Sequence, residues 1–343
     1  MFTESIEFIE LTGLIDSILE LDPSNTLILC DTNTEIHCLP LLALSQYQTC
    51  IIPAGEENKN LSSCGKVWES LLENNIDRNG CIVNLGGGVI TDLGAFCASV
   101  YKRGISFVNV PTTYMAMVDA AVGGKTAIDF SNIKNPIGTF ADPEEVLIYS
   151  GFLKTLPKEE LINGFAESMK HALIKSSELW EVIKGMNSLT IQDAIEHIPK
   201  SLKVKIDIVE QDPFEMGERK LLNFGHTIGH AIEAYFIENN KDIRHGEAIA
   251  IGMYCEAYIS FKEHYLSMKE VELIRDILRT YYSKKKIISL ELGPIIKKIR
   301  HDKKNNSQGN NFTLLEKIGS GIYNQYIEEA TIQESLESYI DSY

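Results

Sequence analysis

Apolar runs alternate with helix-like segments through the first third of the chain, and this alternation restricts the fold more than any other feature. The runs expected to be strands are continuously apolar, at residues 26–30, 50–53, 81–85 and 105–110. Segments with a helical pattern lie between them and include residues 67–72 and 91–101. Continuous apolar strands joined through helices predict a largely parallel sheet that is covered on both faces. Ligands of such sheets bind beyond the carboxyl ends of the strands.

A glycine run follows the third predicted strand and leads into a helix. Its sequence is Gly86-Gly87-Gly88-Val-Ile-Thr91-Asp92. Glycines let the backbone approach a pyrophosphate closely, and the start of a helix favours its negative charge. The pattern is incomplete for dinucleotide binding because Thr91 stands where a third glycine is expected. A plain tight turn is therefore the alternative.

Polar side chains follow the first two predicted strands. Asp31 and Asn33 come after the first, and Glu56 and Lys59 come after the second. Carboxylates and amides at the ends of parallel strands are suited to binding ribose hydroxyls. Each of them, taken alone, is more simply an ordinary solvated loop residue.

Residues 110–138 combine many polar groups with glycines and other small residues. The polar groups are Thr112, Thr113, Asp119, Lys125, Lys134 and Asn135. Their density predicts the wall of a close-fitting ligand site. The alternative is a long loop with scattered charges.

The pattern becomes helical after about residue 142. Helices are predicted at residues 159–175, 177–185, 191–210, 227–238 and 246–263. The rest of the chain is polar and helical, except for a less regular basic segment at 301–309 and a short strand at 312–315. We therefore expect an α/β domain over residues 1–150 and a mainly helical domain over residues 151–343.

His226 and His230 are four residues apart, so on a helix they share one face. Such a pair is a common way to hold a transition metal. Thr227 follows His226 where a zinc protease has glutamate, so that signature is absent. The alternative is a buried helix with two hydrogen-bonded histidines. Arg219, Asn223 and His245 nearby favour a metal site.

A metal held by His226 and His245 needs a third ligand, and spacing does not select it among many carboxylates. Glu167 is one candidate. Glu167 and Lys170 share a helix face and, considered alone, predict a surface ion pair. Lys205 and Arg219 are solvated cations by the same default.

Composition excludes several classes of protein. The 343-residue chain has a formal net charge of −16, which argues against nucleic acid and anionic membranes as partners. No apolar run reaches the roughly 20 residues of a membrane helix. No basic segment precedes an apolar one at the N-terminus, so no secretory signal is expected. The seven dispersed cysteines lack a Cys-x-x-Cys pair and predict reduced, buried thiols in a cytoplasmic protein.

Several motifs, in order, resemble those of the 3-dehydroquinate synthases, sugar phosphate cyclases of the shikimate pathway. The resemblance extends from about residue 31 to 319. The motifs are Gly86-Gly-Gly-Val-Ile-Thr-Asp-Leu, Tyr101-Lys-Arg-Gly, Val110-Pro-Thr-Thr, Val118-Asp with Gly123-Gly-Lys-Thr126, Gly164-Phe-Ala-Glu167, Asn223-Phe-Gly-His-Thr-Ile-Gly-His230 and His245-Gly-Glu-Ala.

The resemblance implies a Rossmann-like parallel-sheet domain, a mainly helical domain, and an active site in the cleft between them. It implies that Zn²⁺, for which Co²⁺ can substitute, is bound by Glu167, His226 and His245, which makes His230 a substrate-side residue. The implied substrate residues are Asp119, Lys125, Asn135, Lys170, Lys205, Arg219, Asn223, His230 and Lys303, with Arg103 from a second subunit of a homodimer. The implied NAD⁺ residues are Asp31, Asn33, Glu56, Lys59, Gly87, Gly88, Asp92, Thr112, Thr113, Lys125 and Lys134.

The implied substrate is 3-deoxy-D-arabino-heptulosonate 7-phosphate, which carries a carboxylate and a phosphate. The implied reaction oxidises the substrate transiently with NAD⁺, eliminates phosphate, reduces the ketone again, opens the ring and closes it by an intramolecular aldol step. On this interpretation Lys125, Arg103 and His230 hold the phosphate, and Arg219 holds the carboxylate.

Some details depart from the commonest family pattern. Ala120-Ala121 stand where small hydroxyl residues are frequent, and Lys170 has unusual neighbours. Three alternatives remain: a cyclase that makes a valiolone or a scyllo-inosose, a polyol or glycerol-phosphate dehydrogenase on the same fold, and a non-catalytic paralogue. The related cyclases tend to replace residues at the positions of Arg219, Asn223, His230 or Lys303, and the dehydrogenases usually have aspartate at the position of Glu167.

Overall fold

The computed structural model describes residues 5–131, 133–300 and 309–342. The chain divides into two compact units, Met1–Leu161 and Ile162–Tyr343. The boundary falls within one helix, α6 (Lys158–Lys175). Each unit has its own buried apolar core.

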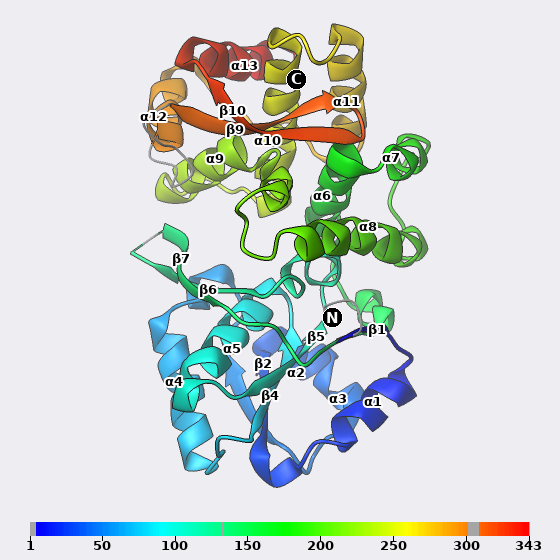
Figure 1. Ribbon diagram of the computed structural model, residues 1–343, viewed down its shortest axis with the longest axis vertical. Coiled ribbons are helices and arrows are strands. Elements are labelled where there is room, and N and C mark those ends of the chain that lie inside the picture. Colours follow the sequence, from blue (N-terminus) through cyan, green and yellow to red (C-terminus); the bar gives the residue numbers. More distant parts are fainter. Residues whose placement is uncertain (1–4, 132, 301–308, 343) are drawn as a thin grey trace. The chain divides into compact units, whose positions relative to one another are not determined.

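A six-stranded sheet forms the centre of the first unit (Figure 1). Its strands are arranged in the order β1-β8-β5-β4-β2-β3, and every neighbouring pair is parallel. Their bounds are β1 Ile6–Phe8, β2 Thr26–Asp31, β3 Gln48–Ile52, β4 Cys81–Gly86, β5 Ser106–Pro111 and β8 Glu145–Ile148. The predicted parallel sheet is confirmed, with β1 and β8 as strands that were not expected.

Pairing within this sheet brings several predicted ligand-binding segments to one edge. Cys30 of β2 pairs with Leu85 of β4, and Leu85 pairs with Val110 of β5. The three strands therefore end in register. The residues at these strand ends and directly after them, among them Asp31, the glycine run and Thr112, lie along the carboxyl edge where ligands of parallel sheets bind.

Helices cover both faces of the sheet, as the continuous apolar strands require. In Figure 1, α4 and α5 lie on one side and α1 and α3 on the other. The α4 and α5 side contains a core that includes Leu27, Val67 and Leu93, all fully buried. The bounds are α1 Leu11–Leu19, α2 Thr32–His37, α3 Leu39–Leu42, α4 Leu61–Glu73 and α5 Gly88–Val100. Short 3₁₀ helices are η2 Pro23–Asn25, η3 Glu56–Asn58, η4 Tyr101–Arg103 and η6 Ser150–Lys154.

Residues 110–138, for which a long loop was the alternative interpretation, contain regular structure. A π-helix, η5 (Ala116–Ala120), follows β5. An antiparallel hairpin of β6 (Lys125–Phe130) and β7 (Ile133–Phe140) comes next. The alternative of a long loop is wrong, because Lys125, Lys134 and Asn135 sit within strands. The same hairpin buries the apolar side chains of Ala127 and Ile128.

The second unit is mainly helical, as predicted. Its helices after α6 are α7 Ser177–Lys184, α8 Ile191–Gln211, η7 Glu218–Asn223, α9 His226–Glu238, α10 His245–Lys262, α11 Met268–Tyr281, α12 Ser289–Arg300 and α13 Glu329–Ser342. An antiparallel pair, β9 (Asn310–Lys317) and β10 (Ser320–Ile327), replaces the single short strand that was expected.

Helix α10 is the centre of this unit. Most of its residues are buried, and it packs against α9, α11, α13 and β9. A helix whose residues are buried on all sides is typically enclosed by other elements of the core. The structure thus places the first residues of α9 and α10 at fixed positions in a well-packed core.

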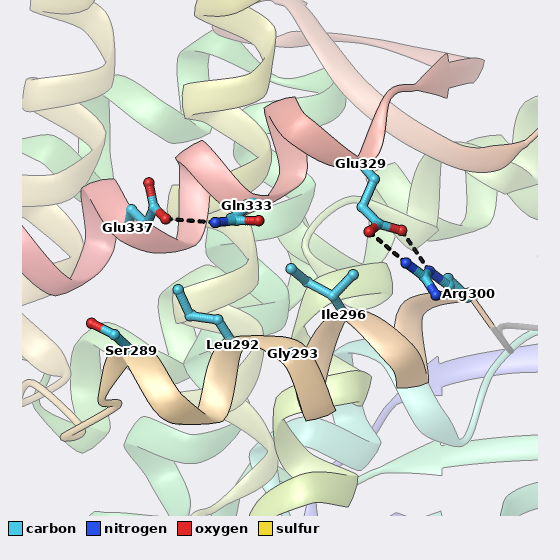
Figure 2. Close-up of a pocket in the computed structure, with 8 residues that line it drawn as sticks. All are labelled: Ser289, Leu292, Gly293, Ile296, Arg300, Glu329, Gln333 and Glu337. Atoms are coloured by element: carbon cyan, nitrogen blue, oxygen red, sulfur yellow. Dashed lines mark hydrogen bonds and ion pairs between the residues drawn. The ribbon is translucent and has the colours of Figure 1, made fainter.

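A cavity of about 310 Å³ lies between α12 and α13. Figure 2 shows Leu292 and Ile296 on α12, with Gln333 on α13 opposite them. Arg300 and Glu329 form a two-bond ion pair at one end, with both hydrogen bonds 2.5 Å long. None of the residues that line this cavity is a predicted site residue.

All seven cysteines are buried and free, which agrees with the expectation of reduced thiols. Within the described ranges, no helix has the length and apolarity to cross a membrane.

Candidate metal centre and cofactor-binding edge

Glu167, His226 and His245 meet at one point in the second unit. The Oε1 atom of Glu167 on α6 lies 3.6 Å from Nε2 of His226 and 3.5 Å from Nε2 of His245. Ligand atoms around a tetrahedral zinc ion with bonds of about 2.1 Å are separated by about 3.4 Å. Both distances therefore match the spacing of metal ligands.

Hydrogen bonds fix the orientation of both imidazoles. Nδ1 of His226 lies 3.0 Å from the carbonyl oxygen of Phe224, and Nδ1 of His245 lies 3.2 Å from Oε2 of Glu233. Each Nδ1 therefore carries the proton and donates it, which leaves the Nε2 lone pair directed at Glu167. Two lone pairs facing a carboxylate oxygen repel it unless a cation lies between them, so this donor set fits a divalent metal.

Charge at the site supports the same interpretation. Burial alone would raise the pKa of Glu167, but its neighbours, above all the ammonium group of Lys170, together outweigh burial and hold that pKa well below its usual range. Burial and Lys170 lower the pKa of His226, which keeps its imidazole neutral. An ionised carboxylate and neutral imidazoles are the forms that bind zinc. Glu167 and Lys170 form a buried ion pair, so the expectation of a surface pair was wrong.

Helix starts determine where the two histidines lie. His226 is the first residue of α9, and His245 is the first residue of α10. Asn163 of α6 accepts a hydrogen bond of 2.6 Å from the backbone N–H of Gly246, which satisfies a free donor at the start of α10. Glu167 lies one helical turn after Asn163, so this contact brings it toward His245.

His230 belongs to the same cluster. Its ring centroid lies 5.0 Å from that of His226 and 5.7 Å from that of His245. Donor atoms of the three histidines all lie within 4.8 Å of one another. The geometry thus also permits a three-histidine ligand set, and assigning His230 to the substrate stays a prediction.

Other predicted substrate residues of this unit are more buried than the default expectation. Lys170, Lys205 and Arg219 are at most 6% exposed. Arg219 donates to the carbonyl oxygen of Pro213 over 2.5 Å. The amide of Asn223 donates to Oε1 of Glu215 over 2.6 Å. The sequence reasoning did not identify Glu215, and Lys303 lies outside the described residues.

In the first unit, Lys59 joins a cluster of predicted residues. Its buried Nζ lies 2.5 Å from Oδ2 of Asp92 and 2.7 Å from Oδ1 of Asn135. Glu56 lies 3.9 Å from Lys59 and 3.7 Å from Lys134. The structure therefore groups Asn135, expected to contact the substrate, with residues expected to bind NAD⁺.

Asp129 is a further member of this cluster that the sequence did not indicate. Its Oδ1 accepts a 2.8 Å hydrogen bond from the backbone N–H of Asn135, and its own N–H donates to the carbonyl oxygen of Lys59. Burial raises the pKa of Asp129, and Glu56 adds to the increase. Asn135 has a φ of 53°, so this contact holds it in the left-handed region.

The glycine run lies at the carboxyl edge of β4. Gly87 precedes α5, and a Cβ added to it would lie 2.9 Å from Cγ2 of Thr113. Thr112 is buried and its N–H donates to the carbonyl oxygen of Gly86. A helix start lined by glycine and threonine fits a pyrophosphate group.

The remaining predicted residues are placed as follows. Asp31 caps α2 by accepting hydrogen bonds from the N–H groups of Asn33 and Thr34. Asn33 and Lys125 are exposed, and Asp119 in η5 is half-buried. Arg103 is exposed and has a φ of 73°.

Two family models match the chain. The model for the N-terminal part of 3-dehydroquinate synthase matches residues 49–163, and the model for its C-terminal part matches residues 164–305. A 3-dehydroquinate synthase of Parabacteroides distasonis is 38% identical over 336 residues, which cover 96% of this chain and 95% of the relative. One of Pyrococcus furiosus is 44% identical over 261 residues, which cover 75% and 76%.

Solved structures share the fold. A 2-epi-5-epi-valiolone synthase from Streptomyces hygroscopicus subsp. jinggangensis, with NAD⁺ and Zn²⁺ bound, has a TM-score of 0.87 at 24% identity over 97% of this chain and 95% of that one. A 2-deoxy-scyllo-inosose synthase with carbaglucose-6-phosphate, NAD⁺ and Co²⁺ has a TM-score of 0.79, also at 24% identity, over 97% and 96%.

Proposed function

The chain belongs to the 3-dehydroquinate synthase family, and we propose that its residues convert 3-deoxy-D-arabino-heptulosonate 7-phosphate to 3-dehydroquinate and phosphate. The reaction makes the protein a carbon–oxygen lyase. The observation that carries this proposal is the meeting of one buried carboxylate and two oriented imidazoles, Glu167, His226 and His245, around a point with metal-ligand spacing.

Glu167, His226 and His245 would hold Zn²⁺, or Co²⁺ in its place. When bound, the metal would supply Lewis-acid polarisation of a substrate oxygen. The chain's own contribution is orientation, because the hydrogen bonds at Nδ1 fix both imidazoles before any metal arrives. Lys170 keeps Glu167 ionised, so the ligand set carries the negative charge that a divalent cation requires.

The carboxyl edge of the parallel sheet would hold NAD⁺. The cofactor supplies a hydride acceptor and donor, so it ends the cycle unchanged. The proposed contacts are Asp31, Asn33, Glu56, Lys59, Gly87, Gly88, Asp92, Thr112, Thr113, Lys125 and Lys134. The start of α5 favours the pyrophosphate, and the carboxylates and amides suit ribose hydroxyls.

Cations would hold the two anionic groups of the substrate. We assign the phosphate to Lys125, His230 and Arg103 of a second subunit, and the carboxylate to Arg219. The remaining assigned substrate contacts are Asp119, Asn135, Lys170, Lys205, Asn223 and Lys303. The burial of Lys170, Lys205 and Arg219 supports these roles, because lysine and arginine are rarely buried without a structural or functional reason.

The proposal also includes a division into domains, an oligomeric state and a cellular location. Residues 1–150 form the NAD⁺-binding domain and residues 151–343 the metal- and substrate-binding domain. The protein works as a homodimer in the cytoplasm, where Arg103 of one subunit completes the site of the other. The exposure of the Arg103 side chain supports this feature.

A related cyclase activity is the second candidate, because the two cyclases named above share the fold. The family resemblance implies that such cyclases tend to replace residues at the positions of Arg219, Asn223, His230 or Lys303, so the presence of all four here argues against this candidate. A substrate without the carboxylate distinguishes the two candidates because it has no partner for Arg219.

Phosphate release tests the proposal. Purified protein with NAD⁺ and the heptulosonate phosphate is expected to release inorganic phosphate without accumulating NADH. A heptulose phosphate that lacks the carboxylate is expected to release far less. Steady NADH formation would instead indicate a dehydrogenase, and equal turnover of both sugar phosphates would indicate the related cyclases.

A further inference from the structure

Two buried glutamates near the candidate metal centre have no assigned role. Glu233 lies on α9 and is 7% exposed, and Glu256 lies on α10 and is fully buried. A buried carboxylate is costly unless it accepts hydrogen bonds, so each is expected to have a structural or functional partner. Both accept hydrogen bonds from groups at the starts of helices.

Glu233 of α9 contacts the first residue of α10. Its Oε2 lies 3.2 Å from Nδ1 of His245, on the side of the ring opposite the nitrogen that faces Glu167. A carboxylate in this position fixes which nitrogen carries the proton and makes the other nitrogen a better metal ligand. Glu233 thus orients His245.

Glu256 of α10 contacts the start of α9. Its Oε2 accepts a hydrogen bond from the backbone N–H of Gly225, and its Oε1 accepts one of 3.2 Å from the N–H of Ile228. His226 lies between these two residues. Glu256 therefore satisfies N–H groups that the first turn of a helix leaves unpaired. The positive end of the helix dipole also stabilises its negative charge.

Close packing of the two helices makes this exchange possible. Gly225 has a φ of +79°, and a Cβ added to Gly252 would lie 1.9 Å from the carbonyl oxygen of Gly225. The backbone of α10 therefore touches the start of α9 directly. At this separation the side chain of Glu256 reaches the N–H groups on either side of His226.

We propose that Glu233 and Glu256 form a reciprocal carboxylate pair, in which each helix carries the group that positions the metal-binding histidine at the start of the other. The inference rests on the proposed metal site. Both are positioning residues, because neither touches the metal or the substrate. The pair would set the affinity and geometry of metal binding before any substrate arrives.

Metal binding without turnover tests the pair. Zinc dissociation constants are measured by competition with a chelator, and the visible spectrum of the Co²⁺-loaded protein reports coordination geometry. Glu233→Ala is expected to weaken zinc binding roughly 10- to 100-fold, the usual effect of losing the hydrogen-bond partner of a ligand. Glu233→Gln keeps an acceptor for His245 and is expected to restore part of the affinity. Glu256→Gln is expected to weaken binding roughly tenfold and to shift the Co²⁺ spectrum, because an amide accepts only one of the two hydrogen bonds.

Controls separate this inference from the metal site itself. Glu291 is a buried carboxylate on α12 that accepts a hydrogen bond from the N–H of Ile288, so Glu291→Gln is a matched variant expected to leave zinc affinity and the Co²⁺ spectrum unchanged. If His226→Ala and His245→Ala lose zinc while all Glu233 and Glu256 variants bind it like the parent protein, the carboxylate pair is refuted and the metal site stands. If the two histidine variants keep full zinc affinity, the metal site is refuted and the pair with it.

Discussion

Two carboxylates, one in each unit, show how differently the two candidate sites are constructed. Glu167 in the second unit faces two imidazoles and a buried lysine, and its pKa is held well below the usual range. Asp129 in the first unit faces backbone N–H and an acidic neighbour, and burial raises its pKa. The first is kept ionised in a place where two nitrogen lone pairs also converge. The second supports the backbone of a hairpin.

The two sites also differ in their charge balance. The donor atoms of the candidate metal centre need a cation between them, whereas the carboxylate of Asp92 in the Lys59 cluster is already paired with a lysine. At the candidate metal centre, donors of electron pairs face one another, and a cation would complete the set. In the Lys59 cluster, the lysine already pairs with Asp92 and Asn135. We therefore expect metal binding to change the stability of the second unit strongly. Changes to the Lys59 cluster should instead act through the protein's own hydrogen bonds.

The largest expected effect is the loss of Glu167, a proposed metal ligand. Glu167→Ala and His245→Ala are expected to lose bound zinc and phosphate release together, with turnover reduced roughly 1,000-fold because the metal contributes several kcal/mol to catalysis. Zinc content is measured by mass spectrometry and turnover by phosphate release. Full zinc and full turnover in either variant would show that the assigned site is wrong.

Substitution of Gly252 tests whether the metal centre depends on the contact between α9 and α10. Gly252→Ala places a methyl group against the backbone of Gly225, where no side chain can move aside, and is expected to cost about 3 kcal/mol of unfolding free energy. Urea denaturation measures this cost.

Gly65→Ala on α4 is the matched control for Gly252→Ala, because an added Cβ there meets no heavy atom within 4 Å. We expect this helix to gain roughly 0.5–1 kcal/mol from the substitution. Equal effects at the two positions would mean that the close approach of α9 and α10 does not matter.

Loss of the buried cation tests the neutralised site. Lys59→Met leaves Asp92 and Asn135 without their shared hydrogen-bond donor and is expected to cost about 2 kcal/mol of stability. The cost is limited to this value because the Asp92 carboxylate is partly accessible to water. NAD⁺ affinity is expected to fall roughly tenfold, measured by calorimetry. Lys134→Met removes an exposed cation 3.7 Å from Glu56 and should change stability by less than about 1 kcal/mol. A larger loss of stability for Lys134→Met than for Lys59→Met would contradict this ranking.

Much of the fold could be predicted from the sequence, because strands and helices are indicated by the pattern of apolar residues within short segments. The parallel sheet was predictable because β2, β4 and β5 are continuous apolar runs, and helices α6 to α10 were predictable from their periodicity. The β6–β7 hairpin was not, because its polar residues resemble those of a loop. The short strand β1 has two exposed residues among its three and is held by pairing with β8.

The candidate site was predictable only where motifs carry it. The motifs indicate Glu167, His226 and His245, whose convergence depends on the packing of α6, α9 and α10. Glu233 and Glu256 were missed because a single glutamate on a helix is usually solvated, and burial cannot be read from one sequence. Glu233 lies seven residues after His226 and hence on the same helix face, a signal that only the structure makes meaningful.

The smallest expected effect on stability is at Asp129, the carboxylate of the first unit. Because burial raises the pKa of Asp129 above its ordinary value of 3.8, the folded state holds the proton more tightly than the unfolded state. As pH rises above 3.8, the unfolded state ionises first, so the Asp129 carboxylate increasingly disfavours folding until its folded pKa is passed. Asp129→Asn removes this dependence and keeps an oxygen that accepts the hydrogen bond from Asn135. At neutral pH we expect the variant to be more stable than the parent by less than about 1 kcal/mol, with the advantage shrinking toward acid pH. Urea denaturation across this range measures it, and an advantage that grows toward acid pH would reverse the assigned sign.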